Sequence, residues 1–306
     1  MRAPHHLLLR ALFQPLPEAE RWWRRWRTIV NLDKLDRGSF YTLPALAGCM
    51  HGWIQDDPYR EILLGICRRA WSQKQIRKKV LAEALSLLRA SGIGAAAAIG
   101  PLAWEQLYWP AGAIRMIEGV DLVVEPGSVS LCMQAFLRSG WTVHGRPPDW
   151  NGSKFYFAAA IRMRTDSGEE VRLHWRDLPN TDFALRRPDP PEFKPTTDER
   201  ATLYTPSAAR DLVLALGGVF DDGLDWRCDA LMICRSNVEW NVVETLLKWR
   251  SRAKMRLAEL RRDWGVQVPQ IIVAKLYTAS VERMVTAPLR AYRHAKLKLL
   301  ERRVGT

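Results

Sequence analysis

One short segment, residues 114–124 (IRMIEGVDLVV), constrains the fold of this chain more than any other. Its second half is apolar and β-branched apart from Asp121, a composition that is typical of a strand buried on both faces. An isolated carboxylate in such a strand costs free energy unless a cation or hydrogen bonds compensate it. The fold therefore has to bring a positive partner, either a metal ion or a basic side chain, to Asp121.

The residues around this segment alternate between strand and helix patterns. Residues 93–99 are apolar and end at Gly100-Pro101, which predicts a buried strand that enters a sharp turn. A helix is expected over 102–108, a second helix over 129–138, and an extended piece at 141–143. Residues 153–175 predict a β-hairpin, with its turn at 165–168 and its return strand at 169–175. Together these elements predict a small mixed β-sheet.

The first 92 residues predict helices. Within 18–30, four apolar side chains fall at helical spacing: Trp22, Trp26, Ile29 and Val30. They could lie on a membrane surface, but packing inside, with arginine stems alongside, is the preferred interpretation. A clearer helix is expected over 73–90. Its apolar stripe consists of Ile76, Val80, Ala84, Leu87 and Leu88, and Gly92 ends it.

The expected fold class is α+β, with a small mixed sheet flanked by helical regions at both ends. The predicted division is an N-terminal helical region at 1–92, an α/β core at 93–185, a Pro-rich linker at 186–206 and a C-terminal helical region at 207–306. Four prolines close together argue against any regular element in the linker. Thr205 and Pro206 are expected to open the next helix as N-cap and first residue. Helices are expected over 207–216, 226–235, 238–262 and 287–303.

Charge is unevenly distributed along the chain. The net charge is +13 overall, divided as +8 over residues 1–92, −5 over 93–240 and +10 over 241–306. The basic ends could bind an anionic partner, such as an acidic protein or peptide or a nucleic acid, or could be ordinary solvated helix faces. No apolar run is long enough for a membrane span, and the N-terminus does not have the pattern of a signal peptide.

The five cysteines are scattered and none has CxxC spacing. This pattern predicts reduced thiols in a cytoplasmic protein rather than a metal site or a catalytic nucleophile. The sequence also has no Ser-His-Asp signature, P-loop or dinucleotide fingerprint.

The order of elements, together with a few short motifs, resembles the polymerase-β-like nucleotidyltransferase superfamily. More narrowly, it resembles bacterial proteins described as nucleotidyltransferase family proteins. The residues that carry the resemblance are Gly100, Arg115, the run 120–124 with Asp121, Gly140-Trp141 and Leu173-His174-Trp175. The resemblance implies a nucleotide site near Gly100, Arg115, Arg172 and His174. Trp175 is expected in the core, and His174 could be either a proton shuttle or a structural histidine.

The family's chemistry uses two Mg²⁺ ions held by carboxylates at i and i+2 of one strand and by a third carboxylate on a neighbouring strand. This chain departs from that pattern at three positions. Gly119 stands at the first carboxylate and Arg172 at the third, and Ile99 replaces the lysine before the turn glycine. If the family's strand pairing holds, the Arg172 guanidinium should pair with Asp121 in place of a metal. No metal and no cofactor is then expected.

Two functions follow from these departures. The first is a nucleotidyltransferase-fold protein that lacks two-metal catalysis and acts as a binding or scaffolding partner in a biosynthetic or modification pathway. The alternative is an active transferase that uses Mg²⁺ and a nucleoside triphosphate. It would move a nucleotidyl group to a hydroxyl of a peptide, a small molecule or an RNA. Its shifted carboxylate set would be Asp121, Glu118 and Glu170. A nucleic-acid binder that uses the basic ends is a third hypothesis, without a supporting motif.

Overall fold

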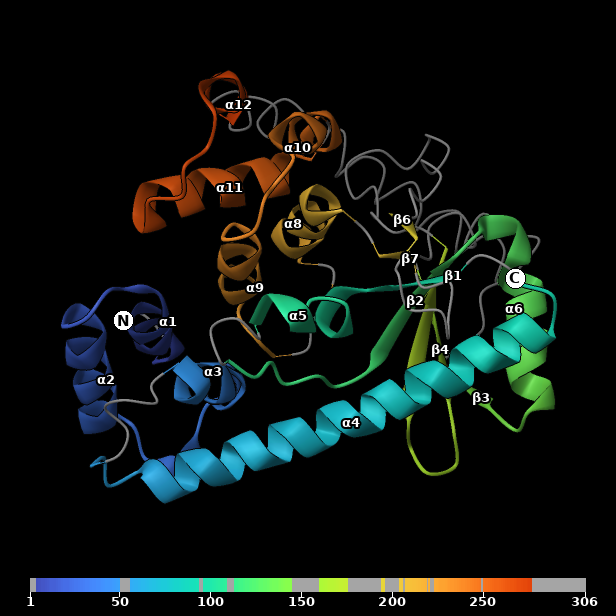
Figure 1. Ribbon diagram of the computed structural model, residues 1–306, viewed down its shortest axis with the longest axis horizontal. Helices are drawn as coiled ribbons and strands as arrows, with labels where there is room; N and C mark the ends of the chain where they lie inside the picture. The colour runs from blue at the N-terminus through green and yellow to red at the C-terminus, as the bar shows by residue number, and fades with distance from the viewer. Residues whose placement is uncertain are drawn as a thin grey trace, which may run out of the picture.

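The structure is a computed structural model that describes residues 4–49, 56–93, 96–108, 113–144, 160–175, 194–195, 204–205, 207–218, 220, 223–248 and 250–276. It confirms the predicted α+β class: one five-stranded mixed sheet is flanked by helices from both ends of the chain (Figure 1). Three main clusters of buried side chains hold the fold together, one in each helical region and one on the sheet. In the described part of the chain, no helix is long and apolar enough to cross a membrane.

The N-terminal cluster is built by α1 (His5–Phe13), α2 (Glu18–Ile29) and α3 (Arg37–Cys49). Trp23 and Trp26 stack with their ring centroids 5.1 Å apart, and both are buried. The predicted stripe on α2 was therefore wrong by one position, because Trp23 rather than Trp22 faces the core and Ile29 is 59% exposed. Arginines separate the tryptophans in this helix, so hydrophobic spacing alone leaves the orientation of its inner face ambiguous.

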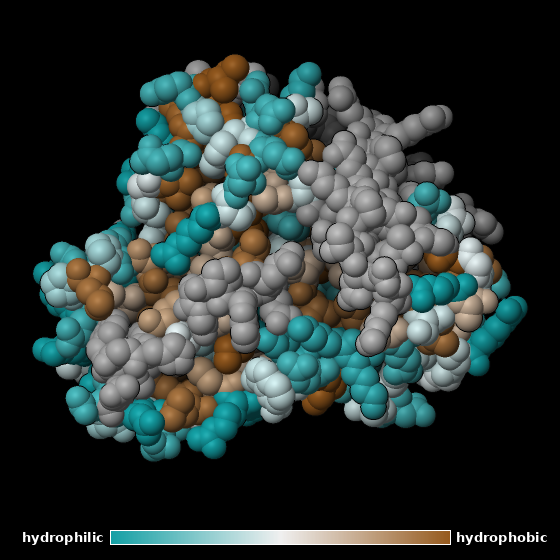
Figure 2. Space-filling view, in the orientation of Figure 1, coloured by the Kyte–Doolittle hydropathy of each residue, from teal (hydrophilic) through white to brown (hydrophobic). Residues whose placement is uncertain are grey.

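Helix α4 (Arg60–Ala90) joins the N-terminal cluster to the sheet. Its 31 residues correspond to about 46 Å at 1.5 Å per residue. Leu63 packs in the N-terminal cluster, whereas Val80, Ala84 and Leu88 pack on the sheet as predicted. The helix begins well before the predicted residue 73, and Ile76 is exposed rather than part of the stripe. The outer face is polar, and Figure 2 shows hydrophilic residues along much of it.

The sheet has the strand order β1-β2-β5-β4-β3. Its strands are β1 (Ala96–Ile99), β2 (Val120–Val124), β3 (Thr142–His144), β4 (Ala160–Arg164) and β5 (Glu170–His174). β1 runs antiparallel to β2, β2 runs parallel to β5, and β5, β4 and β3 are mutually antiparallel neighbours. The predicted hairpin is β4–β5, and residues 153–159 of that prediction lie outside the described residues.

The two faces of the sheet differ in chemistry because alternate residues of a strand point to opposite faces. One face carries Leu122 of β2 and Leu173 of β5, and it packs against α4 and α6 (Val129–Arg138) together with Trp175. The other face carries Asp121 and Arg172, which occupy paired positions in β2 and β5. The hydrophobic core thus lies on one side of the sheet, and the polar residues of the candidate site lie on the other.

The C-terminal region is helical, as predicted, with α8 (Ala208–Gly217) and α9 (Trp226–Ile233) followed by α10 (Trp240–Leu247), α11 (Ser251–Trp264) and α12 (Gln270–Leu276). The single helix predicted over 238–262 was wrong: α10 and α11 are separate helices that each pack against α8. The predicted N-cap was also wrong. Ser207, rather than Thr205, caps α8 by accepting a hydrogen bond from the Arg210 backbone N–H.

Residues 113–119, which lead into β2, are extended but form no strand, so the strand predicted over 114–124 is shorter than expected. Arg115 explains this path. It is buried, and its Nε and Nη2 donate to the two carboxylate oxygens of Asp229 in α9 at 2.7 and 2.8 Å. The Tyr108 hydroxyl also donates to Asp229, at 2.6 Å. This bidentate ion pair ties the segment before β2 to a helix instead of to a neighbouring strand.

Two further predictions fall largely on residues outside those described. Within the Pro-rich linker, β6 (Lys194–Pro195) pairs with β7 (Tyr204–Thr205), so the expectation of no regular element there was wrong for these two short pieces. The α5 helix (Glu105–Tyr108) covers only the second half of the helix predicted over 102–108, because Gly100–Leu102 forms a 3₁₀ turn. The basic helix predicted over 287–303 lies outside the described residues.

Asp211 makes stability depend on pH. It is buried in α8, and this burial, together with the nearby negative charge of Asp229, raises its pKa to about 7. The unfolded carboxyl ionises near pH 4, so between pH 4 and pH 7 the folded state holds a proton that the unfolded state has released, and stability falls as pH rises. Asp211→Asn removes this titration. Relative to the wild type, its free energy of unfolding in urea should improve by roughly 4 kcal/mol between pH 4 and pH 8.

Asp166→Asn, in the exposed turn between β4 and β5, is the matched control for the loss of a carboxylate. Equal pH profiles for Asp211→Asn and the wild type would show that Asp211 titrates in the folded state as it does in the unfolded chain.

Candidate functional site

The candidate site is centred on Asp121, in the second strand of the sheet. Asp121 is paired with Ile99 of β1 on one side and with Arg172 of β5 on the other. Only 1% of its surface is exposed. The carboxylate is therefore shielded from water and has to be satisfied by protein groups.

Two basic side chains of β5 hold the Asp121 carboxylate. Arg172 Nη2 donates to Oδ2 at 2.7 Å, and His174 Nε2 donates to Oδ1 at 2.7 Å. The two residues are at i and i+2 of one strand, so both side chains point to the face that carries Asp121. The Asp121–Arg172 ion pair predicted from the sequence is confirmed, and His174 is a second partner that was not expected there.

Gly119 provides the space that Arg172 occupies. A Cβ atom built at Gly119 would lie 3.3 Å from Arg172 Nη2 and 3.6 Å from its Cζ. The guanidinium thus lies where the side chain of residue 119 would extend, two residues before Asp121 on the same face. The glycine and the arginine are structurally linked, because a larger residue at 119 would displace the arginine.

An aromatic ring covers the turn at the end of β1. Gly100 has φ +71°, in the left-handed region, and a Cβ atom there would lie 2.6 Å from the Phe220 ring. Phe220 also packs on Ile99 and Val123 and lies edge-on to His174, with ring centroids 6.2 Å apart. The backbone of the glycine turn, which the resemblance assigns to phosphate, faces this ring.

The other predicted site residues lie elsewhere. Arg115 is buried against Asp229 and is not brought to Asp121. Glu118 is turned toward α3, where Arg37 Nη2 lies 3.1 Å from both of its carboxylate oxygens and the Tyr41 hydroxyl donates to it. Glu170 lies at the start of β5, where its nearest printed partner is Arg162, with Nε 4.0 Å from Oε1. Asp121, Glu118 and Glu170 therefore do not converge on one point.

A different group has the composition of a metal site. One potential ligand atom each of His5, His6 and Asp225 lies within 4.8 Å of the others, and no other such group of three occurs among the residues the structure describes. Asp225 already has partners. It caps α9 by accepting from the Arg227 backbone N–H, and Arg227 Nη1 contacts both carboxylate oxygens at 3.0 and 2.8 Å. Burial opposes ionisation of Asp225, but His5 and Arg227 outweigh it and lower its pKa to about 2. These contacts account for the group as a helix cap.

The cysteines are not activated. All five are free thiols, and burial raises the pKa of each, to about 11 for Cys67 and about 12 for Cys132 and Cys234. A nucleophilic or metal-binding cysteine needs a lowered pKa. The expectation of reduced structural thiols agrees with this geometry.

Sequence reasoning missed Phe220, and it left the role of His174 open. The spacing of Arg172 and His174 was a usable signal, since residues two apart in a strand share a face. Phe220 gave no such signal. It comes from a short connection more than a hundred residues along the chain from Gly100, and only the folded chain brings them together.

Comparison with models of known protein families finds no match, and no curated protein sequence matches the chain significantly.

Arg172 should be needed for stability because it neutralises a buried charge. Arg172→Ala leaves the Asp121 carboxylate with only His174 as a partner, which should lower the free energy of unfolding in urea by about 3–5 kcal/mol. Arg162→Ala is the matched control, since Arg162 pairs with position 172 in the neighbouring strand but its side chain is 57% exposed. It should cost about 1 kcal/mol or less. Equal costs for the two variants would contradict the ion pair as the main compensation for Asp121.

Proposed function

We propose that this chain is a nucleotidyltransferase-like protein without two-metal catalysis, which acts as a binding or scaffolding partner in a biosynthetic or modification pathway. The observation that carries the proposal is the state of Asp121. At the one acidic position that the chain keeps from the resembled pattern, both carboxylate oxygens are held by basic side chains of β5.

The residues at this site do not fit two magnesium ions. Mg²⁺ requires several hard oxygen ligands in near-octahedral geometry. Here a glycine and an arginine stand where the resemblance places two of the three carboxylates, and Glu118 and Glu170 are held elsewhere. Each lost carboxylate removes an attraction of about 4 kcal/mol or more at 4 Å and an effective dielectric of 20, and the guanidinium adds repulsion.

The site keeps a capacity to bind anions. Two buried nitrogen atoms, Arg172 Nε and His174 Nδ1, have no hydrogen-bond partner among the described residues. Buried polar atoms normally find a partner. A small anion or a carbonyl oxygen of a partner could be that partner if the Phe220 ring moves aside. This favours a binding role over a site that has only a structural function.

The alternative, an active transferase with a shifted carboxylate set, has no specific observation in its favour. A cytoplasmic location is part of the proposal, because all five thiols are free.

The proposal is tested by the effect of magnesium on nucleotide binding. Isothermal titration calorimetry of the full chain with ATP should give the same affinity in Mg²⁺ as in EDTA, because no oxygen-ligand cluster surrounds Asp121. An affinity at least about tenfold higher with Mg²⁺ would overturn the proposal and favour the active transferase.

A double variant serves as the positive control. Gly119→Asp combined with Arg172→Asp places three carboxylates on the Asp121 face and removes the guanidinium that fills the space beside Gly119. Mg²⁺ titrated into this variant should bind measurably more tightly than to the wild type, provided that circular dichroism shows the variant to be folded.

The basic C-terminal tail is expected to strengthen binding to an anionic partner. Truncation after Ser280 should leave the core folded and lower the salt concentration at which the protein elutes from immobilised heparin, a polyanion, because charges of Arg290, Arg293 and their neighbours are removed. Unchanged elution would rule out a contact role for the tail.

A further inference from the structure

A cavity of about 540 Å³ lies between helices from both ends of the chain, separate from the sheet site. Side chains of α1, α2, α9 and α11 line it, and in Figure 1 these helices lie on the side of the molecule away from β3, β4 and α6. Its volume is in the range of pockets that bind small molecules.

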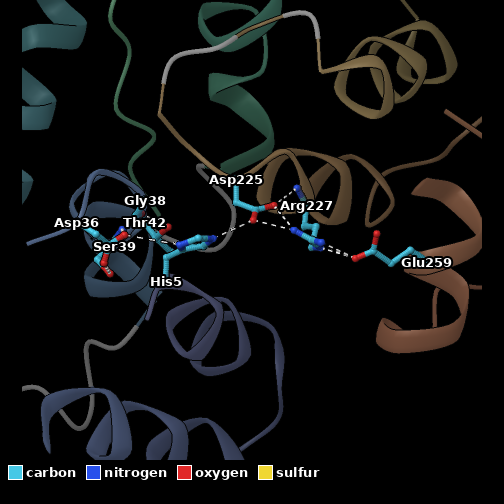
Figure 3. A network of polar contacts seen from close by, with 8 residues as sticks. All are labelled: His5, Asp36, Gly38, Ser39, Thr42, Asp225, Arg227 and Glu259. Carbon is cyan, nitrogen blue, oxygen red and sulfur yellow. Dashed lines mark hydrogen bonds and ion pairs between the residues drawn. The ribbon is translucent and has the colours of Figure 1, made fainter. Parts of the chain in front are cut away.

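The two carboxylates at this cavity are already neutralised. Glu259 accepts hydrogen bonds from Arg227 Nε and Nη2 at 2.7 and 2.5 Å. Figure 3 shows Arg227 between Glu259 and Asp225, with contacts to both. Asp263 accepts from its neighbour Arg262 at 2.8 and 3.0 Å. Neither carboxylate therefore offsets the charge of the remaining arginines.

Those remaining arginines lie against tryptophan rings. The guanidinium carbon of Arg10 lies 4.4 Å from the ring centroid of Trp264, and that of Arg25 lies 5.8 Å from the centroid of Trp22. In the described part of the chain, neither Arg10 nor Arg25 has an ion pair of its own. The cavity thus combines two flat aromatic walls with two positive charges that are free to accept an anion.

We propose that this cavity binds a small molecule with a flat ring and a phosphate group. The phosphate would take paired hydrogen bonds from Arg10 and Arg25, whose fork of N–H donors matches phosphate oxygens. The ring would lie against Trp22 or Trp264, because stacked and edge-on aromatic contacts add to the free energy of burial. The Arg227–Glu259 ion pair would form a fixed wall between α9 and α11.

The test uses adenosine 5′-monophosphate as the probe, titrated into the full chain by calorimetry in EDTA, so that magnesium-dependent binding elsewhere does not contribute. The inference is independent of the proposed function, because it involves none of the residues around Asp121. The monophosphate should bind, and its affinity should fall with ionic strength because screening weakens the contacts with Arg10 and Arg25. Adenosine and inorganic phosphate should each bind at least about tenfold more weakly.

Variants then locate the site. Arg10→Ala, Arg25→Ala and Trp22→Ala should each weaken binding of the monophosphate by about tenfold or more. Arg24→Ala is the matched control: Arg24 is in the same helix as Trp22 and Arg25, is exposed, and pairs with Glu20 rather than lining the cavity. Trp71→Ala, which removes an exposed tryptophan of α4, is the control for the aromatic wall.

Three results would overturn the inference. The first is absence of binding of the monophosphate to the wild type up to about 10 mM. The second is equal binding by adenosine or by inorganic phosphate alone, which would show that the charges or the rings are not used. The third is unchanged affinity in all three cavity variants, with circular dichroism confirming that they fold as the wild type does.

Discussion

A carboxylate in the middle of a β-sheet cannot be left without a positive partner, and much of the arrangement around β2 follows from that requirement. Arg172 and His174 have to be on one strand, two residues apart, and that strand has to lie beside β2. Gly119 has to lack a side chain so that the guanidinium fits. Removing two acidic ligands and adding a basic residue is one linked change, because each substitution makes sense only with the others.

The sequence predicts those features that depend on neighbours along the chain. Helix α6 has the predicted bounds, β1 and the β4–β5 hairpin lie where turn residues indicated, and Gly92 follows α4 with a positive φ. The pairing of Asp121 with Arg172 could also be predicted, because the parallel register of the two strands was an expectation of the resemblance rather than of either residue alone.

The remaining features could not be predicted because they depend on contacts between distant segments. Arg115 has the same local pattern whether it binds a phosphate or Asp229, and only the position of α9 decides between them. Trp22 and Trp23 are equally apolar, and the packing of α2 on its neighbours selects Trp23 for the core. In both cases the deciding partner lies far away in the sequence, where periodicity carries no information.

Two helices belong to more than one hydrophobic cluster. α4 contributes Leu63 to the N-terminal cluster and Val80 to the sheet, and α9 contributes Met232 to the N-terminal cluster and Ala230 to the C-terminal one. Neither half of such a helix can lose its packing without weakening a second cluster. The regions are therefore coupled during unfolding, and a fragment cut at residue 92 would separate the sheet from the helix that covers its apolar face.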